Sequence, residues 1–446
     1  MNLHALLKTR ATNHNPVRVG LIGAGKFGSM YLSQIPRTPG IHLLGLADLS
    51  PTRAADALTR VGWTAEQFAA TSFESAFKAG STFITDDSMA LIADPHVDVI
   101  IDATGSPSAG IAHVLACCAH KKHIVMVNVE ADALAGPLLA QKAREAGIVY
   151  SLAYGDQPAL IAEMVDWARA AGFSVVAAGK GTKYLPAYHA STPDTVWGHY
   201  GFTPEMVGAG DFNAQMFNSF LDGTKSAIEM AAVANACDLT PAPDGLAFPA
   251  CGVDDLARLL KPKTDGGILN HRGQVEVISS VERDGLPVFR DLRWGVYVTF
   301  AADSEYVRRC FKEYGLITDA SGEYSSMYKP FHLIGLELGI SVASVALRGE
   351  ATGVATGFRG DCVAAAKRAL KIGDTLDGEG GYTVYGKLMP ANASLKIGAL
   401  PIGLAHKFKL VRDVGIGEIV TWQDVAFEAS NPAVKFRREM EATFRK

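Results

Sequence analysis

Several features that would mark other classes of protein are missing from this sequence of 446 residues. No uninterrupted apolar stretch reaches the 18 residues or so that a transmembrane helix needs. The first 16 residues lack the apolar core of a secretory signal, so we expect a cytoplasmic protein. Like charges never form a long run and the formal net charge is −4, so we expect neither nucleic acid nor a membrane as partner.

The six cysteines form no C-x-x-C pair and no regular framework, which favours free thiols in a reducing compartment. Metal-site spacings such as H-E-x-x-H or an EF-hand loop are also missing, and the metal ligands, if any, stay unknown. There is no G-x-S-x-G elbow of a serine hydrolase. What is abundant is apolar sequence: 48% of the residues are hydrophobic, enough for sizeable cores.

The first 153 residues alternate short apolar runs with helical stretches. The runs are rich in Val and Ile and apolar on both faces, as buried parallel strands are. They are VRVGLI (17–22), HLLGLAD (42–48), VDVIIDAT (97–104), HIVMVNVE (123–130) and IVYSLA (148–153). Ala and Leu at helical spacing fill 29–35, 52–60, 108–120 and 133–146. This β-α-β order predicts a doubly wound sheet.

Past residue 153 the order becomes mixed. Strands are expected at 175–179, 274–282 and 293–302, and helices at 214–237, 305–314 and 331–347. After residue 348 short strands and glycine-rich turns dominate. We therefore predict an α/β protein with an N-terminal Rossmann doubly wound sheet (1–153), a central α+β catalytic and dimerisation domain (154–347) and a small C-terminal all-β domain (348–446).

A glycine motif follows the first expected strand. Because 45 of the 446 residues are glycine, G-x-G-x-x-G alone is a weak signal, but its place between a strand and a helix strengthens it. Its members are Gly23, Gly25, Lys26, Phe27 and Gly28. In a dinucleotide site such glycines allow the tight turn, the approach of the pyrophosphate and close helix packing. The alternative is an ordinary glycine-rich turn.

Asp48 stands 20 residues beyond Gly28, at the end of the second expected strand. In a dinucleotide site, a carboxylate at this position binds the ribose 2′-hydroxyl of the adenosine. The alternative is that Asp48 is a helix cap on the surface. Taken alone, Asp48 favours NAD, because it repels a 2′-phosphate. Lys26 and Arg53 lie near it in sequence and offset that repulsion, so the residues leave NAD and NADP both open.

Two further loops follow expected strands and should face the cofactor, because ligands bind at the carboxyl ends of parallel strands. The first contains Thr104, Gly105 and Ser106, and the second contains Asn128 and Glu130. The alternative for Glu130, and for Asp132 beyond it, is a charge that stabilises the N-terminus of the next helix.

Catalytic candidates lie in the expected helix 214–237. Asp222, Lys225 and Glu229 fall on one face of it, among small apolar residues. A buried lysine between two carboxylates keeps its charge and can orient a hydroxyl or carbonyl. The alternative is a surface Lys225–Glu229 pair of small energetic weight.

Basic residues elsewhere suit an anionic substrate. The segment GKGTKY (179–184) fails the P-loop pattern, yet Lys180 and Lys183 remain candidates for anion binding. Lys329 and His332 precede or begin the expected helix 331–347 and would point into a cleft there. The alternatives are a solvated loop and a core histidine.

The chain also resembles a known group of enzymes. GLIGAGKFGSM, DATGSPSAG, VMVNVEADALAGPLLA, YGDQPAL, GKGTKYLP, FNSFLDGTKSAIEMA and YKPFHLIGLELGISVASVALRGEATG are similar to segments of homoserine dehydrogenase-related oxidoreductases. Within that group the whole chain resembles deoxyxylulose phosphate reductoisomerase-like enzymes. The C-terminal LPIGLAHKFKLVRDVGIGEIVTWQDV resembles the SAF β-clip module.

This resemblance implies a homodimeric, NADPH-dependent conversion of 1-deoxy-D-xylulose 5-phosphate to 2-C-methyl-D-erythritol 4-phosphate, a step of isoprenoid precursor synthesis. It implies a divalent cation, Mg²⁺ or Mn²⁺, as a further cofactor. Lys225 matches the catalytic lysine of homoserine dehydrogenases, whereas Asp222 is one position out of register with their aspartate. Lys183, Lys329 and His332 would bind the substrate phosphate. GAGKFG departs from the glycine loop of ordinary reductoisomerases, and their acidic metal-ligand run is not found.

Two alternatives remain open at this point. One is a homoserine dehydrogenase-like enzyme that oxidises a small polyol, sugar-acid or amino-acid alcohol without rearrangement. The other is a dinucleotide sensor without catalytic activity, which the charged residues of the apolar helix 214–237 disfavour, because buried charges are costly unless they are used.

Overall fold

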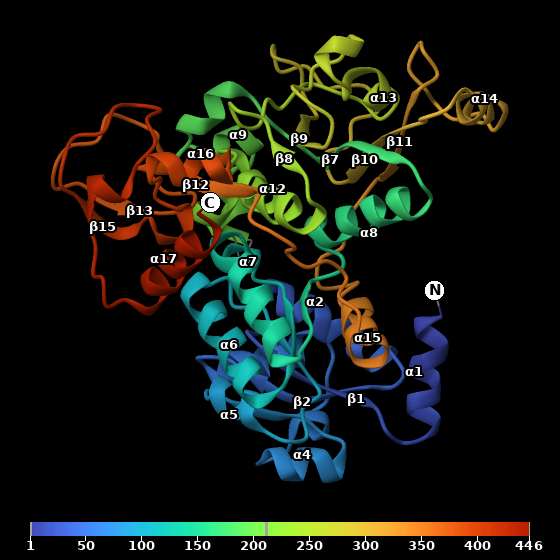
Figure 1. Ribbon diagram of the computed structural model, residues 1–446. Helices are drawn as coiled ribbons and strands as arrows, with labels where there is room; N and C mark the ends of the chain where they lie inside the picture. Colours follow the sequence, from blue (N-terminus) through green and yellow to red (C-terminus); the bar gives the residue numbers. More distant parts are fainter. Residues whose placement is uncertain (1, 210–212, 446) are drawn as a thin grey trace. The chain divides into compact units, whose positions relative to one another are not determined.

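A computed structural model describes residues 2–209 and 213–445 of the chain (Figure 1). The contacts divide it into two compact units: residues 1–160 with 332–355, and residues 161–331 with 356–446. The bounds of the three predicted domains (1–153, 154–347 and 348–446) stay a prediction. Each unit is described on its own below.

The first unit contains the predicted doubly wound sheet. Its six strands run in the order β3-β2-β1-β4-β5-β6 and every pairing is parallel. The strands are β1 (Val17–Ile22), β2 (Ile41–Ala47), β3 (Phe83–Thr85), β4 (Val99–Asp102), β5 (His123–Met126) and β6 (Tyr150–Leu152). This order is that of a Rossmann fold, and it confirms the five predicted strands. The prediction missed β3, which is only three residues long.

Helices connect the strands of this sheet. They are α2 (Lys26–Gln34), α3 (Pro51–Arg60), α4 (Phe73–Ala79), α5 (Ser88–Ala93), α6 (Pro107–His120) and α7 (Val129–Ala146), with α1 (Leu3–Thr12) preceding β1. Several begin at a side chain that accepts a backbone hydrogen bond, including Ser50 at α3, Asp87 at α5 and Ser106 at α6. Such caps fix where each helix starts, and thus where each loop at the carboxyl edge of the sheet lies.

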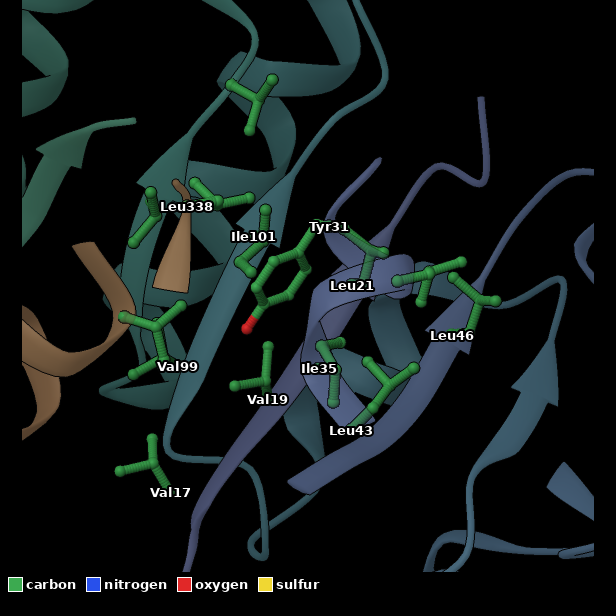
Figure 2. Packing of buried hydrophobic residues seen from close by; sticks show 14 of the residues in the cluster. Val17, Val19, Leu21, Tyr31, Ile35, Leu43, Leu46, Val99, Ile101 and Leu338 are labelled. Carbon is green, nitrogen blue, oxygen red and sulfur yellow. The ribbon is translucent and has the colours of Figure 1, made fainter. Parts of the chain in front are cut away.

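An apolar core lies against one side of this sheet (Figure 2). The ring of Tyr31 from α2 packs among strand residues such as Val19 and Ile101, and all three are almost fully buried. Leu338 joins the same cluster from the far end of the sequence, just before helix α15 (Gly339–Arg348). Helices α1 and α15 lie side by side in this unit (Figure 1).

The predicted helix 331–347 is therefore wrong in its start. The structure begins α15 at Gly339, and residues 331–338 form an irregular segment with turns. The apolar pattern from 331 onward is continuous, but Gly335 has a positive φ of 79° that an uninterrupted helix does not allow. The apolar surface of α15 is buried against the Rossmann sheet, which explains why it is apolar nearly all round.

The second unit is built on a mixed sheet in the order β11-β10-β7-β9-β8. Its strands are β7 (Ser174–Thr182), β8 (Thr240–Pro241), β9 (Gln274–Ser279), β10 (Val296–Ala301) and β11 (Tyr324–Lys329). The β7–β9 and β8–β9 pairs are parallel and the others antiparallel. Helices α8 (Gln157–Ala170), α11 (Ala214–Leu221), α12 (Thr224–Cys237) and α14 (Glu305–Glu313) accompany it. The mixed order confirms the predicted α+β character.

Small antiparallel sheets form the C-terminal part of this unit, as predicted. Strand β12 (Gly360–Ala366) pairs with β14 (Val384–Pro390), and β15 (His406–Leu410) pairs with β13 (Thr375–Asp377) and β16 (Val425–Ala426). The C-terminal part also contains two helices that the all-β prediction did not include, α16 (Ala391–Ile397) and α17 (Pro432–Phe444). Arg437 of α17 is fully buried between Asp361 and Glu441, which anchors the helix. Helix α12 packs on β12 and β14.

Two further predictions can be compared directly with the structure. All six cysteines are free, as their spacing indicated. No helix in the described ranges is long and apolar enough to cross a membrane.

Candidate functional site

The glycine turn between β1 and α2 has the geometry of a dinucleotide cradle. Gly23 has a φ of +102°, a backbone conformation that glycine adopts without strain. A Cβ on Gly28 would lie 2.2 Å from the carbonyl oxygen of Gly23, so only glycine lets α2 approach the turn. A Cβ on Gly25 would meet no atom within 4 Å. The three glycines thus serve the turn, the helix packing and an open approach, as the motif predicts.

Asp48 follows β2 and is tied to this turn. Its Oδ2 accepts a hydrogen bond of 2.9 Å from the backbone N–H of Ala24, next to Gly23. Its Oδ1 accepts bonds from the N–H of Ser50, at 3.0 Å, and from Nη2 of Arg53, at 2.7 Å. The side chain of Asp48 is 3% exposed, whereas that of Arg53 is 63% exposed. Asp48 therefore fixes the glycine turn and holds a cation beside it.

A cavity of about 470 Å³ opens at this edge of the sheet. It lies beyond the carboxyl ends of β1, β2, β3 and β4, where ligands bind in doubly wound folds. Its lining consists of Ile22, Gly23, Gly25, Ala47, Asp48, Leu49, Arg53, Asp86, Ser88, Met89, Ala103, Thr104, Ser106, Ala109, Ala112 and His113. Six of the predicted cofactor residues are among them, on three different loops. This volume is within the roughly 300–1,000 Å³ range of small-molecule sites.

The other predicted cofactor residues lie beside the cavity rather than in its described lining. Phe27 packs on the apolar core, Gly28 faces the glycine turn, and Lys26 is the first residue of α2. Asn128 donates hydrogen bonds to Thr104 Oγ1, at 3.2 Å, and to the carbonyl of Ser106, at 2.8 Å. Asn128 thereby supports the loop that contains Gly105, whose φ is +66°.

A hydrogen-bonded series of side chains forms another wall of this cavity, and the sequence analysis missed it. His113 Nδ1 lies 3.0 Å from Oδ2 of Asp102, and His113 Nε2 lies 3.1 Å from Oγ of Ser88. Asp102 is fully buried and also accepts 2.7 Å and 2.9 Å bonds from Oγ1 and N of Thr104. Because a carboxylate only accepts, Nδ1 of His113 carries a proton and donates to Asp102, while Nε2 faces the hydroxyl of Ser88.

The start of α7 separates its two acidic residues. Asp132 is fully buried and its Oδ1 accepts a 2.7 Å bond from the hydroxyl of Tyr150. Burial raises the pKa of Asp132 to about 6, and the bond from Tyr150 opposes that rise. Glu130 is partly exposed in the first helical turn, where it complements the helix dipole. A direct role of Glu130 in the reaction stays a prediction.

In the second unit, the predicted helix 214–237 is wrong at its centre. Helix α11 ends at Leu221 and α12 begins at Thr224, with Gly223 between them at a φ of +90°. Asp222 is thus not on one helical face with Lys225 and Glu229. Instead its Oδ1 accepts a 2.8 Å bond from the N–H of Thr224 at the start of α12.

Asp222 is paired with a lysine that the sequence analysis did not consider. Its Oδ2 lies 2.7 Å from Nζ of Lys367, and both side chains are almost completely buried. Lys367 also donates to the carbonyls of Ser191 and Gly381, at 2.8 and 2.7 Å. Burial raises the pKa of Asp222, while the charge and hydrogen bond of Lys367 act in the opposite direction. This pair joins the α11–α12 turn to the C-terminal strands, and a catalytic role of Asp222 stays a prediction.

Lys225 and Glu229 remain one turn apart on α12. Glu229 is buried and forms an ion pair with Lys180 of β7, which is also buried. Lys225 is partly exposed at the second position of the helix. The buried ion pair at this helix is therefore between Glu229 and Lys180 of the neighbouring sheet, and Lys225 is not buried between two carboxylates as predicted. A buried ion pair of this kind costs desolvation and persists where both charges are held by each other.

The three residues predicted to bind a phosphate are in different surroundings. Lys183 donates a 2.7 Å bond to the carbonyl of His199, and burial lowers the pKa of its ammonium. Lys329 ends strand β11, with its Nζ 5.5 Å from the ring centre of Phe331. His332 belongs to the first unit, where its Nδ1 lies 3.5 Å from Nε2 of Gln157. Since α15 starts at Gly339, Lys329 and His332 do not lie at a helix N-terminus as predicted.

Among the residues that the structure describes, no three His, Cys, Asp or Glu side chains gather as metal ligands. A divalent cation therefore remains a prediction from resemblance.

Two family models match the chain. "Oxidoreductase family, NAD-binding Rossmann fold" (GFO/IDH/MocA) matches residues 17–127, and "Oxidoreductase DRL, catalytic domain" matches residues 155–338. The first covers the glycine turn and the cavity; the second covers Lys180, Lys225 and Glu229. Neither description names the reductoisomerase activity or the SAF module of the predicted resemblance. None of the curated proteins compared with the chain matches it.

Solved structures match part of the chain. An NAD binding oxidoreductase from Klebsiella pneumoniae is 21% identical over 40% of this chain and 47% of its own, with a TM-score of 0.27. Myo-inositol dehydrogenase from Lactobacillus casei, in complex with NAD(H) and myo-inositol, is 17% identical over 41% and 50%, with a TM-score of 0.28. Biliverdin reductase from Synechocystis is 21% identical over 38% and 48%, with a TM-score of 0.26.

The chain spans about half the length of these structures. The assignment therefore rests on the two family models and on the glycine turn with its cavity. Residues 17–127 are thus similar to the NAD-binding Rossmann fold of the GFO/IDH/MocA oxidoreductases, and residues 155–338 are similar to the catalytic domain of oxidoreductase DRL.

Proposed function

We propose that the protein oxidises the alcohol group of a small polyol, sugar acid or amino-acid alcohol, or reduces the matching carbonyl, without rearranging the carbon skeleton. The observation that carries this proposal is the open space at Gly25 in the wall of a cavity bordered by Asp48. A pyrophosphate fits where a side chain is missing, and a ribose fits beside the carboxylate.

Bound NAD(P) supplies or accepts the hydride. The chain's own contribution is to hold it: the amides at the start of α2 face the pyrophosphate, and Asp48 accepts a hydrogen bond from the ribose. We further propose NADPH as the preferred form. The exposed guanidinium of Arg53, 2.7 Å from Asp48, is placed to pair with a 2′-phosphate and to neutralise the carboxylate beside it.

For the substrate, we propose Lys225 as the group that stabilises the reacting oxygen. During hydride transfer this oxygen gains or loses negative charge, and a nearby ammonium lowers the energy of that charge. Glu229, paired with Lys180, sets the electrostatic surroundings one turn further along α12. Lys183, Lys329 and His332 remain proposed ligands of an anionic group on the substrate.

The narrower prediction adds an isomerisation before the hydride step, with 1-deoxy-D-xylulose 5-phosphate as substrate and a divalent cation as second cofactor. The matched families are described by oxidoreductase chemistry alone, which fits the simpler dehydrogenase better. A homodimer in the cytoplasm likewise stays a prediction, and light scattering of the purified protein would determine its oligomeric state.

The test is a screen that follows NADH and NADPH at 340 nm with polyols, sugar acids, homoserine and phosphorylated ketoses. We expect turnover of one hydroxylated substrate, with an unbranched product by NMR. A branched product from the ketose phosphate would replace this proposal by the reductoisomerase. Cofactor binding without turnover of any member of the panel would contradict the proposed substrate class.

A further inference from the structure

The second unit contains a small cavity that none of the assignments above uses. It has a volume of about 160 Å³ and lies between the start of α12, the loop 244–248 and strand β14. Its lining consists of His189, Gly223, Ala227, Asp244, Leu246, Phe248, Tyr385, Gly386, Lys387 and Leu388. Gly223 and Ala227 are one helical turn apart, whereas Lys225 lies on a different face of α12. This cavity is therefore separate from the Lys225–Glu229 side of the helix.

The walls of the cavity are built from stacked rings. The imidazole of His189 stacks on Tyr385, with ring centres 4.4 Å apart, and Tyr184 stacks on Phe248 at 3.9 Å. His189 Nδ1 lies 2.7 Å from the carbonyl oxygen of Asp222, and its Nε2 lies 2.9 Å from Oη of Tyr184. Because a carbonyl only accepts, Nδ1 of His189 carries a proton and donates to it. Burial lowers the pKa of His189, and in the neutral imidazole Nε2 accepts from the hydroxyl of Tyr184.

The loop of the cavity is also firmly held. Phe248 has a positive φ of 49°, which is strained for a residue with a large side chain. Its N–H and that of Ala247 both donate to Oε1 of the buried Glu276, at 3.3 and 3.0 Å. Strained backbone persists where the surrounding contacts determine it, and such places are enriched at ligand sites.

Three polar side-chain ends in the lining have no hydrogen-bond or ion-pair partner among the residues that the structure describes. Within the described residues, Lys387 and Asp244 form no ion pair or hydrogen bond through their side chains, and the hydroxyl of Tyr385 forms no hydrogen bond. One is a cation, one an anion and one a neutral donor and acceptor. Charged groups beside a cavity without internal partners are available to a ligand with complementary groups.

We propose that this cavity binds a small hydroxy acid. Lys387 pairs with its carboxylate, and Asp244 and Tyr385 form hydrogen bonds with its hydroxyl groups. The rings of Phe248 and Tyr385 contact the carbon chain. The volume, below the roughly 300 Å³ at which drug-sized sites begin, limits the ligand to a few carbons and excludes a nucleotide. This inference does not depend on the proposed reaction.

The cavity lies beside the turn between α11 and α12, which a bound ligand would contact. Gly223 lines the cavity, and His189 is bonded to the carbonyl of Asp222, at the turn where α12 begins. A bound acid would therefore restrict the turn that leads into Lys225.

Isothermal titration of the full chain without NAD(P)H, using D-erythronate as probe, tests the proposal. We expect saturable binding of D-erythronate and none of erythritol, which lacks the carboxylate. Lys387→Met should weaken binding by about tenfold or more, because a charge-assisted hydrogen bond is lost. Lys435→Met, an exposed lysine on α17, is the matched control and should leave binding unchanged.

If Lys387→Met does not fold, Tyr385→Phe keeps the stacking on His189 and removes only the hydroxyl, and we expect it to weaken binding several-fold. Equal binding of erythritol, tighter binding of L-threonine than of D-erythronate, or no saturable binding of D-erythronate would each overturn the proposal. Because cofactor is left out, a failed titration is independent of whether the protein turns over its substrate.

Discussion

Nδ1 of His113 lies 3.0 Å from Oδ2 of Asp102, and both side chains are buried behind the wall of the dinucleotide cavity. The other nitrogen of His113, Nε2, lies 3.1 Å from Oγ of Ser88, which lines the same cavity. A buried carboxylate thus determines the tautomer and the orientation of an imidazole that a cofactor would contact.

Replacing His113 by Phe should therefore impair cofactor binding. Oδ2 of Asp102 loses the hydrogen bond from Nδ1 of His113, at a cost of about 1–3 kcal/mol in the free energy of unfolding. The distorted wall should weaken NAD(P)H binding by roughly tenfold, measured by fluorescence titration. Ser88→Ala, which leaves the His113–Asp102 bond in place, is the control and should keep wild-type stability. A folded His113→Phe variant with unchanged affinity would show that this wall does not contact the cofactor.

The two glycines of the turn should respond differently to the same substitution. Gly25→Val places its side chain in open space at an ordinary φ of −68°, so the protein should fold and lose cofactor binding. Gly28→Val brings Cβ to 2.2 Å from the carbonyl oxygen of Gly23, so this variant should be destabilised. Thermal unfolding and NAD(P)H titration of both variants check the prediction, and retained binding by Gly25→Val would contradict it.

Arg53 should decide between the two nicotinamide cofactors. Arg53→Ala removes the exposed guanidinium beside Asp48 and leaves the carboxylate alone. We expect the kcat/KM for NADPH to fall by about tenfold or more, from the loss of a charge-assisted contact, while the value for NADH changes little. The exposed Arg258→Ala in the second unit serves as a control. A wild-type preference for NADH that Arg53→Ala leaves intact would mean that Asp48 governs the ribose pocket.

The sequence predicts the Rossmann half well for a physical reason. Its strands are buried on both faces and its glycine motif is local, so both leave a pattern within a few residues. The Ser88–His113–Asp102 series leaves no such pattern, because its members come from two helices and a strand that only the sheet brings together. Hydrogen bonds between residues that are far apart in the sequence become visible only in the structure.

The second unit shows the opposite case. The apolar pattern runs on through 214–237, so the single Gly223 did not indicate the break between α11 and α12. Asp222 forms an ion pair with Lys367 of the C-terminal part, and Glu229 forms one with Lys180 of β7. The sequence predicted Lys225 as the buried partner of Asp222 and Glu229, but both carboxylates pair with other lysines that only tertiary packing brings to them.

Asp132 should make stability depend on pH. Burial raises its pKa from 3.8 to about 6, so between these values the folded protein binds the proton more tightly than the unfolded chain. Stability therefore falls as the pH rises through this window, and the full penalty applies above it. Asp132→Asn still accepts the hydrogen bond from Tyr150 but carries no charge.

We expect Asp132→Asn to be more stable than the wild type at pH 7.5, by up to about 3 kcal/mol, with the difference vanishing near pH 4. Denaturant unfolding at both pH values measures it. Asp56→Asn, at an exposed position of α3, should show no such dependence. A difference that does not change with pH would indicate that Asp132 keeps its ordinary pKa.

Lys225→Met tests the proposed reacting centre. Methionine keeps the length and removes the charge, so turnover should fall by on the order of 10²-fold or more if the ammonium stabilises the reacting oxygen. Affinity for NAD(P)H should stay unchanged, because Lys225 lies outside the unit that contains the glycine turn. Its partly exposed position on α12 predicts little loss of stability.

Glu229→Gln distinguishes catalysis from structure at the same helix. It replaces the carboxylate that faces the buried Lys180 by a neutral amide, so this variant should be destabilised by several kcal/mol at most. Steady-state kinetics and thermal unfolding of both variants separate the two roles: a stable, inactive Lys225→Met beside an unstable Glu229→Gln supports the proposal. Near-normal turnover by Lys225→Met would make this lysine structural, and the oxygen-stabilising group would then have to be sought elsewhere in the chain.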